Sequence, residues 1–436
     1  MATLVTDLRD LPAFDYTDAE LHGPRFHATM AALRGRGWIA STPLGYVVLE
    51  REAASFFLRT RSAEFPGMKI AELFAIEEGP LLEEMRRNIL HLNGDQHRRL
   101  RGLVSPAFTP RAVERWRPAM RSFLASLWDD VREAGRCELV TAFAKPYPSL
   151  TIATVMGASL ADAPRLHEWS NWIQRQFDPP VLMSERPRIE RAVEEFYAYA
   201  GELLERRRRT PGDDLISQLI AAESEGDRLS DVELVNLVLN VLIGGVDTTQ
   251  SQLAHALRLL AGEPSQWAAL RADPAGLAGA AVEEALRFEP ITPFTARILV
   301  EQVEYRDVTF PKDTIVLVSS FSANRDGIAN GERFDITRGA GAGGAAGASG
   351  TGTGASGTGA SGTGASGAPP RLLTFGAGVH YCLGANLARA ELQEALAFLA
   401  ARIETLELDG EPVYEGVQGV YGLASLPLRF SVAPQE

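Results

Sequence analysis

The stretch FGAGVHYCLG, residues 375–384, places one of only two cysteines in the chain among three glycines and a histidine. Cys382 comes directly before a predicted helix that begins near Gly384, where free backbone N–H groups and the helix dipole favour a thiolate. Gly376, Gly378 and Gly384 permit positive φ angles and close approach of the backbone on either side of the cysteine. A thiolate held in this way suits a soft metal ligand, although these residues alone also allow a nucleophilic cysteine.

The composition of the chain excludes several classes of protein. It has 436 residues, 45% of them hydrophobic, and a net charge of −13, which argues against general nucleic-acid binding. Cys137 and Cys382 allow at most one disulfide and exclude a zinc site built on several cysteines. The N-terminus, MATLVTDLRD, lacks a signal-peptide pattern, and the apolar stretch LVNLVLNVLIGGV is shorter than the ~20 residues that span a bilayer. We therefore expect a cytoplasmic protein without a membrane span.

The periodicity of apolar residues predicts a mainly α fold with small β-sheets. Ser230 and Glu233 form a capping box at the start of a helix that continues to about Leu260, which is long enough to cross the middle of the molecule. Strands are expected in WIAS and YVVLE around a turn at TPLG, and in VTFPKDTIVLVSS. A last amphipathic helix follows Gly384, with an apolar face made of Leu392, Leu396, Leu399 and Ile403.

Residues 339–368 differ from the rest of the chain in amino-acid composition. They contain only Gly, Ala, Ser and Thr, with GTGAS three times in a row from Gly352. Such residues cannot bury enough apolar area to offset the entropy of ordering the backbone. We expect a disordered insertion at 339–368 within a single domain that spans residues 1–436.

FGAGVHYCLG resembles the haem-binding loop of the cytochrome P450 family, whose pattern is Phe-Gly-x-Gly-x-His-x-Cys-x-Gly. The resemblance implies haem b as cofactor and Cys382 as the proximal iron ligand. It also implies that His380 contacts a haem propionate and that Phe375, Gly376 and Gly384 shape the loop around the cofactor.

HRRLR, residues 97–101, resembles the propionate-binding segment of the same family. His97 and Arg101 are four residues apart on one helical face, and Arg297 matches a third propionate partner. Because haem carries two carboxylates, the forked donors of arginine and two imidazoles suit it chemically.

GGVDTT, residues 244–249, is similar to the oxygen-binding groove in the central helix of the family. Two glycines would leave room beside the haem, and the Thr248 hydroxyl can bond back to the Gly244 carbonyl and loosen the helix. Asp247 and Thr248 then resemble the acid–alcohol pair that delivers protons.

EALR resembles the Glu-x-x-Arg motif of the family, which implies a buried ion pair between Glu284 and Arg287. FDITR supplies Arg338 as the further arginine of this cluster, with Arg333 as the alternative. The chain departs from the family here, because 37 positions separate Arg338 from Phe375 where the family has only a handful.

An arginine-rich stretch lies between residues 86 and 121, with nine arginines and only two acidic residues. It is either a solvated helical face or a basic surface that steers an acidic partner. For the second interpretation the candidates are Arg98, Arg99, Arg115 and Arg121.

The resemblance implies a haem-thiolate monooxygenase that inserts one atom of O2 into a hydrophobic organic substrate. Electrons would come from a ferredoxin or flavodoxin with its reductase. Two alternatives stay open: a haem-thiolate protein that binds ligands or gases without turnover, and a cysteine hydrolase, which leaves Glu284, Arg287 and Arg297 unexplained. The substrate pocket is expected to be mostly apolar, with walls from residues 65–92, 168–182, 243, 291–294 and 423–425.

Overall fold

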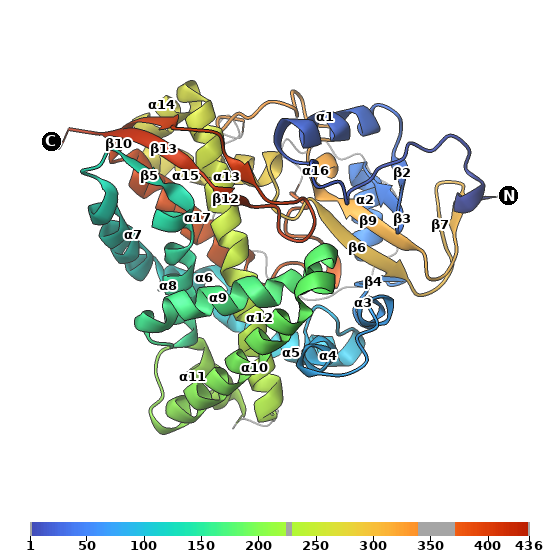
Figure 1. The fold of residues 1–436 in the computed structure, drawn as a ribbon, viewed down its shortest axis with the longest axis horizontal. Coiled ribbons are helices and arrows are strands. Elements are labelled where there is room, and N and C mark those ends of the chain that lie inside the picture. The colour runs from blue at the N-terminus through green and yellow to red at the C-terminus, as the bar shows by residue number, and fades with distance from the viewer. Residues whose placement is uncertain (1, 224–228, 339–370, 435–436) are drawn as a thin grey trace.

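The computed structural model describes residues 2–223, 229–338 and 371–434. Within these ranges the chain is mainly helical with four small sheets (Figure 1). The predicted fold class is therefore confirmed. The insertion predicted at 339–368 lies outside the described residues.

The described helices are α1 (Gly23–Arg34), α2 (Arg51–Arg59), α3 (Met68–Leu73), α4 (Pro80–Arg87), α5 (Gly94–Val104), α6 (Pro110–Glu114), α7 (Arg117–Val131), α8 (Pro146–Met156), α9 (Ala163–Gln174), α10 (Pro179–Arg209), α11 (Leu215–Glu223), α12 (Asp231–Gly245), α13 (Asp247–Gly262), α14 (Pro264–Ala272), α15 (Pro274–Phe288), α16 (Ser320–Ala323) and α17 (Ala385–Ala400). The strands are β1 (Thr3–Leu4), β2 (Ile39–Thr42), β3 (Gly45–Val48), β4 (Ala63–Glu64), β5 (Arg136–Glu138), β6 (Phe294–Leu299), β7 (Val303–Tyr305), β8 (Val308–Phe310), β9 (Ile315–Ser319), β10 (Ile403–Leu408), β11 (Val413–Tyr414), β12 (Leu423–Ser425) and β13 (Pro427–Val432).

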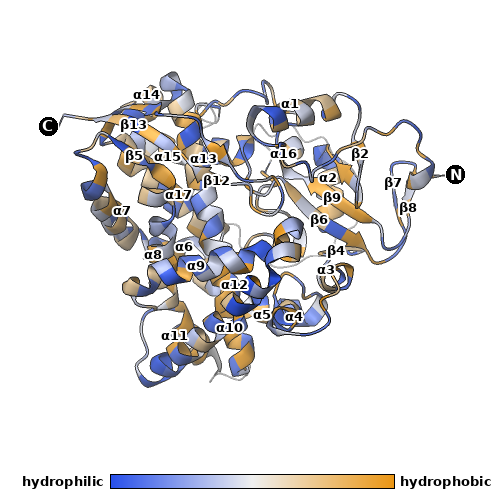
Figure 2. Ribbon diagram, in the orientation of Figure 1, coloured by the Kyte–Doolittle hydropathy of each residue, from blue (hydrophilic) through white to orange (hydrophobic). Residues whose placement is uncertain are grey.

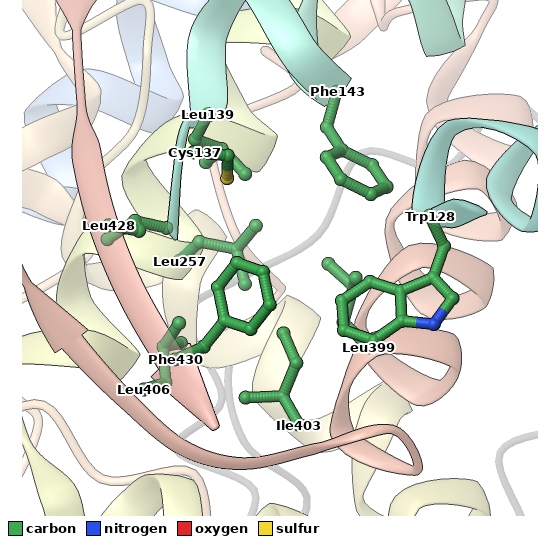
Figure 3. Close-up of a pocket in the computed structure, with 10 residues that line it drawn as sticks. All are labelled: Trp128, Cys137, Leu139, Phe143, Leu257, Leu399, Ile403, Leu406, Leu428 and Phe430. Atoms are coloured by element: carbon green, nitrogen blue, oxygen red, sulfur yellow. The ribbon is translucent and has the colours of Figure 1, made fainter. Parts of the chain in front are cut away.

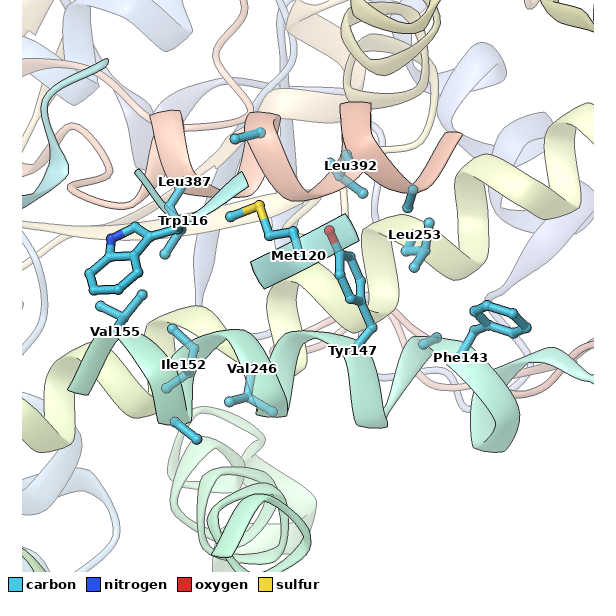
Figure 4. Packing of buried hydrophobic residues seen from close by; sticks show 14 of the residues in the cluster. Trp116, Met120, Phe143, Tyr147, Ile152, Val155, Val246, Leu253, Leu387 and Leu392 are labelled. Carbon is cyan, nitrogen blue, oxygen red and sulfur yellow. The ribbon is translucent and has the colours of Figure 1, made fainter. Parts of the chain in front are cut away.

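The largest apolar core lies among α7, α8, α13, α15 and α17. In Figure 4, Tyr147 and Ile152 of α8 face Leu387 and Leu392 of α17 across the core. Most helices carry both hydrophobic and hydrophilic residues (Figure 2), as amphipathic helices around one core do. Burial of these apolar faces, at roughly 25 cal/mol per Å² of apolar surface, is the main force that holds the helices together.

The long central helix forms as predicted but is divided in two. Ser230 and Glu233 make both hydrogen bonds of the capping box at the start of α12. Val246, with φ −91° and ψ −73°, separates α12 from α13. Together the two helices are long and apolar enough to cross a membrane by composition, yet 67% of their most apolar window is buried inside the fold. They therefore fit the core helix that the sequence predicts.

A five-stranded sheet with the order β2-β3-β9-β6-β4 lies at the other side of the molecule, beside α1 and α2 (Figure 1). The predicted hairpin is its β2–β3 pair, in which Ile39 lies opposite Val48. In β6, Arg297 lies opposite Val316 of β9. This sheet therefore fixes the position of Arg297 relative to the helical part.

The end of the last helix was predicted wrongly. α17 ends at Ala400, and Ile403 begins strand β10, which pairs with β13. Ile403 is nevertheless 4% exposed and belongs to the same core as Leu396 and Leu399. The apolar spacing thus indicated the burial of Ile403, but it could not show that the backbone changes from helix to strand.

Candidate active site

The cysteine-containing loop folds tightly against the end of α2. Gly376 and Gly378 have φ angles of +69° and +73°, which side chains disfavour. A Cβ atom on Gly378 would lie 2.6 Å from the carbonyl oxygen of Leu58, so the approach of the two backbones requires glycine there. The Cys382 N–H donates to the Phe375 carbonyl at 2.9 Å and closes the loop. Gly384 is the N-cap of α17 with a φ of −79°, so unlike the other two glycines it does not take the positive φ that glycine permits.

Groups around the Cys382 sulfur shift the pKa of the thiol in opposite directions. Burial raises the pKa of the thiol, whereas hydrogen bonds from the backbone N–H groups of Gly384 and Ala385 and the charges of Arg101 and Arg389 lower it. The net shift is upward. The loop thus offers hydrogen bonds to a thiolate but needs a further positive charge, such as a metal ion, to keep the sulfur deprotonated.

Cys137 has a different environment. It lies in a pocket of apolar side chains that include Phe143, Leu257 and Phe430 (Figure 3). Burial and the neighbouring Glu138 carboxylate raise the pKa of the Cys137 thiol to about 12. Cys137 is therefore a packing residue, whereas the Cys382 sulfur accepts hydrogen bonds from the backbone of its loop.

The predicted propionate-binding residues gather next to the cysteine loop. His97 is 4% exposed, and its Nε2 has no hydrogen-bond partner in the described chain. The His97 and His380 ring centroids are 4.4 Å apart, and His380 Nε2 lies 3.1 Å from Asn93 Oδ1. Arg101 donates to the Tyr381 carbonyl. Burial, together with the charges of His97, Arg297 and Arg101, lowers the pKa of His380 to about 3.

Arg297 is buried at 4% exposure, and no carboxylate forms an ion pair with it in the part of the chain that the structure describes. Its guanidinium donates to the Ala296 carbonyl at 2.9 Å. Burial lowers the pKa of Arg297 to about 10. A buried cation without an anion is unstable, so this cluster of two arginines and two imidazoles needs negative charge. A bound group with two carboxylates, such as the haem expected from the sequence, would supply the charge and the acceptor atoms that these residues lack.

The groove in the central helix lies at the break between α12 and α13. Thr248 Oγ1 donates to the Gly244 carbonyl at 2.6 Å, as predicted. A Cβ atom on Gly244 would contact nothing within 4 Å, so this residue borders open space. The expectation for Gly245 was wrong, because a Cβ there would lie 2.3 Å from Ile152 Cδ1. Gly245 therefore allows α12 to pack on α8 instead of leaving room for a ligand.

Asp247 lies on the side of the helix that faces α9. It is 5% exposed and accepts hydrogen bonds from Ser170 Oγ at 2.5 Å and Asn171 Nδ2 at 3.3 Å. Burial raises the pKa of the Asp247 carboxyl. Asp247 and Thr248 are thus neighbours in sequence whose side chains have different partners, one on α9 and one on the carbonyl of Gly244.

The structure brings Glu284, Arg287 and Arg338 together. Arg287 donates two hydrogen bonds of 2.7 Å to the Glu284 carboxylate, and Arg338 Nε lies 3.3 Å from Glu284 Oε2. Arg333, the alternative, contributes its main-chain carbonyl as an acceptor for both arginines. The cluster therefore ties α15 to the segment that ends at Arg338, in spite of the long separation from the cysteine loop.

Two residues that contact the cysteine loop were not predicted from the sequence. Arg389 of α17 lies 4.5 Å from the Phe375 ring centroid and pairs with Glu283 at 2.5 Å. Asn93 approaches His380 from the turn before α5. Arg389 and Asn93 contact residues remote in the sequence, so no local sequence pattern indicated either of them.

The arginine-rich stretch carries little free charge in the described chain. Each candidate for partner docking has an acidic neighbour, in the pairs Arg98–Asp95, Arg99–Glu233, Arg115–Asp213 and Arg121–Glu394. Since paired charges are weak sources of long-range attraction, the geometry favours the solvated helical face over a basic docking surface.

Comparison with known proteins agrees with this arrangement. The cytochrome P450 family model matches residues 44–274 and 276–413. The chain belongs to the cytochrome P450 family. It is 34% identical over 434 residues to luteothin monooxygenase of Streptomyces thioluteus, covering 97% of both chains. Mycinamicin IV hydroxylase/epoxidase of Micromonospora griseorubida is 34% identical over 331 residues, with 75% of each chain covered.

Solved cytochrome P450 structures share the fold as well. The crystal structure of CalO2 matches with a TM-score of 0.84 at 28% identity and covers 97% of this chain and 99% of that one. P450BioI, solved with a fatty-acid-ligated acyl carrier protein, matches with a TM-score of 0.78 at 28% identity, covering 93% of this chain and 98% of its own. The chain is accordingly a haem-thiolate monooxygenase that uses haem b, O2, a redox partner and a hydrophobic substrate.

Proposed function

We propose that Cys382 is the proximal iron ligand of this cytochrome P450. Its sulfur accepts hydrogen bonds from the N–H groups of Gly384 and Ala385 at the start of α17, which stabilise a thiolate. Phe375 and Gly376 complete the loop: the Phe375 carbonyl accepts from the Cys382 N–H, and Gly376 takes a positive φ where the backbone turns. Haem b, when bound, supplies the iron centre that activates O2 for insertion of one oxygen atom into the substrate.

We propose that His97, Arg101, Arg297 and His380 hold the two haem propionates. The observation that carries this proposal is Arg297, a buried guanidinium without a carboxylate partner in the described residues. Two propionates would also give the unpartnered His97 Nε2 an acceptor.

Haem and its dimethyl ester test the propionate assignment, because the ester lacks both carboxylates. The wild-type apoprotein should bind haem much more tightly than the ester. Arg297→Leu should weaken haem binding but leave ester binding nearly unchanged, so that the preference for haem falls by about 5–150-fold. Equal loss of haem and ester affinity would mean that Arg297 supports only the fold, and the assignment would be wrong.

Thr248 and Asp247 have separate roles in the proposed proton delivery. Thr248 Oγ1 holds a proton at the edge of the open space beside Gly244, where O2 chemistry takes place. Asp247, held by Ser170 and Asn171, has a raised pKa and therefore binds a proton more readily than an exposed aspartate. Because their side chains have different partners, a proton moves between them only if the Thr248 or Asp247 side chain rotates or a water molecule bridges the two.

The cluster of Glu284, Arg287 and Arg338 is proposed to be structural. The Glu284–Arg287 pair is short and buried, Arg338 is partly exposed, and the other donors of the two arginines reach main-chain carbonyls. The cluster holds α15 against residues 329–338.

A ferredoxin or flavodoxin with its reductase is proposed as the electron donor, in the cytoplasm. Val379 of the cysteine loop is 69% exposed, so the loop reaches the surface close to the proposed iron ligand. We further propose that residues 1–436 act as one cytochrome P450 domain. Stopped-flow reduction by purified ferredoxin and flavodoxin would identify the donor, and failure of both would refute this part of the proposal.

A further inference from the structure

Buried polar side chains gather where α4 and α12 meet the start of α10. Glu84 of α4 and Asn88 directly after it are completely buried, and Asn88 Nδ2 donates to Glu84 Oε1 at 2.6 Å. Gln176, 2% exposed, lies close enough to Glu84 to lower the pKa of that carboxyl, and its Nε2 donates to the Ile173 carbonyl at 3.1 Å. No arginine or lysine forms an ion pair with Glu84 among the described residues. This part of the interior is therefore polar where sequence analysis expected an apolar wall.

α12 contributes two asparagines to the same region. Asn240 Oδ1 accepts a hydrogen bond from the Ile89 N–H at 2.8 Å, and Asn236 Nδ2 donates to the Tyr197 hydroxyl at 2.8 Å. Asn236, Asn240 and Gly244 are spaced by four residues and so lie on one face of the helix. At a rise of 1.5 Å per residue, Asn240 lies about 6 Å and Asn236 about 12 Å from Gly244 along the axis. The polar region thus continues the face that borders the proposed oxidation site.

After these hydrogen bonds are formed, the buried side chains of this region have more unpartnered acceptor atoms than unpartnered donor atoms in the described chain. Five buried atoms have no hydrogen-bond partner in the described chain, namely Glu84 Oε2, His91 Nε2, Gln176 Oε1, Asn236 Oδ1 and Asn240 Nδ2. His91 Nδ1 lies 2.8 Å from the Met85 carbonyl and must donate to it, which makes Nε2 of the neutral ring an acceptor. Burial keeps the ring neutral, because it lowers the pKa of His91 to about 4. His91 Nε2, Gln176 Oε1 and Asn236 Oδ1 are therefore acceptors, whereas Asn240 Nδ2 is a donor and Glu84 Oε2 is one while burial keeps the carboxyl protonated.

We propose that these five side chains form a hydrogen-bond-accepting subsite for the substrate, which binds a donor group such as a hydroxyl roughly 10 Å from the oxidised carbon. The inference rests on the proposed function, since it takes the space beside Gly244 and Thr248 as the oxidation site. Buried acceptors without donors are costly, so a molecule that brings a donor is favoured over one of the same shape that does not. The substrate is then amphipathic, with an apolar body and a polar far end.

Water molecules in the subsite would satisfy the same atoms without selecting a substrate. Matched alcohols and methyl ethers separate the two cases, because the ether keeps the oxygen, adds one methyl group and loses the donor. Suitable pairs are dodecan-1-ol with 1-methoxydodecane, and 4-cyclohexylcyclohexan-1-ol with its methyl ether. Dissociation constants are measured by calorimetry on haem-loaded protein, so that the readout does not depend on turnover.

The proposal predicts that wild-type protein binds the alcohol of at least one pair about tenfold or more tightly than the ether. Asn236→Leu and Gln176→Leu should each reduce this preference to about threefold or less. Gln252→Leu is the matched control, because Gln252 is a buried amide on α13 that donates to the Glu289 carbonyl and lies outside the subsite. It should keep the wild-type preference.

Equal affinities for alcohol and ether in every pair, or no alcohol binding at all, would overturn the proposal and leave a water-filled subsite. A preference that survives in both leucine variants would overturn it as well. These outcomes do not affect the assignment of the haem residues, which is tested separately by the binding of haem and its dimethyl ester.

Discussion

Thr248 Oγ1 donates a hydrogen bond to the carbonyl oxygen of Gly244, four residues earlier, at the junction of α12 and α13. This bond competes for the carbonyl that would otherwise serve only the helix ladder, and Val246 between them, with φ −91° and ψ −73°, departs from ideal helical angles. The hydroxyl thereby lies beside the open space at Gly244. This single hydrogen bond thus lies both at the break in the helix and beside the site where the Thr248 hydroxyl is proposed to deliver protons.

Replacement of Thr248 by alanine should separate haem binding from productive turnover. Thr248→Ala removes the hydroxyl from an accessible helix face and leaves no buried polar group unpaired except one carbonyl, so haem and substrate binding should be retained. Product formed per electron should fall clearly, with peroxide released instead, because general acid–base groups contribute roughly 10²–10⁴-fold. Thr248→Ser, which keeps the hydroxyl, should retain most of the coupling. Unchanged coupling in Thr248→Ala would assign proton delivery to other groups.

Asp247→Asn should slow turnover without a large change in substrate affinity. The amide fills the same space and can keep one of the hydrogen bonds from Ser170 and Asn171, but it cannot exchange a proton at pH 7. Single-turnover kinetics at constant substrate saturation give the comparison. If Asp247→Asn turns over at the wild-type rate, the acid role of Asp247 is wrong.

Loss of the Arg338 side chain should destabilise the protein, whereas loss of the Arg333 side chain should change its stability little. Arg338→Ala breaks an ion pair to a buried carboxylate, and such changes typically cost about 3–5 kcal/mol when a buried charge loses its partner. The Arg338 side chain is partly exposed, so a value at or below the lower end is expected. Arg333→Ala keeps the main-chain carbonyl that the cluster uses and should change stability by less than about 0.5 kcal/mol. Denaturant unfolding of the two holoproteins measures the difference, and equal effects would contradict the assignment of Arg338.

Glu84 should make stability depend on pH between about 5 and 7. Burial raises its pKa from 4.5 to about 7, so in this window the folded protein keeps a proton that the unfolded chain releases. Stability from this group is complete below pH 4.5 and falls as the pH rises, by up to about 3 kcal/mol above pH 7. Glu84→Gln removes the titration, and its stability relative to wild type should therefore increase from pH 5 to 7. A pH-independent difference would show that Glu84 titrates normally.

Features that depend on neighbours in sequence could be predicted. The capping box of Ser230 and Glu233, the Thr248–Gly244 bond and the Glu284–Arg287 pair all join residues three or four apart. Helical geometry alone brings such side chains together. The same spacing could not show that Gly245 packs on α8.

Features that depend on remote segments were missed or left open. Asp247 finds its partners on α9, and the polar character of the pocket wall arises only when α4 approaches Asn236 and Asn240. In the sequence these asparagines interrupt an apolar helix pattern without indicating a common partner. The role of these asparagines depends on tertiary contacts, which the spacing of residues along the sequence does not reveal.

The central claim is that the Cys382 sulfur binds the haem iron, and the carbon monoxide difference spectrum of the reduced protein tests it most directly. Cys137→Ser, the control for general loss of a thiol, should keep the thiolate-type absorption of the wild-type protein, because Cys137 only packs in an apolar pocket. Cys382→Ser should lose that absorption while it retains haem through the propionate-binding residues. A Cys382→Ser protein with the wild-type spectrum would contradict the account.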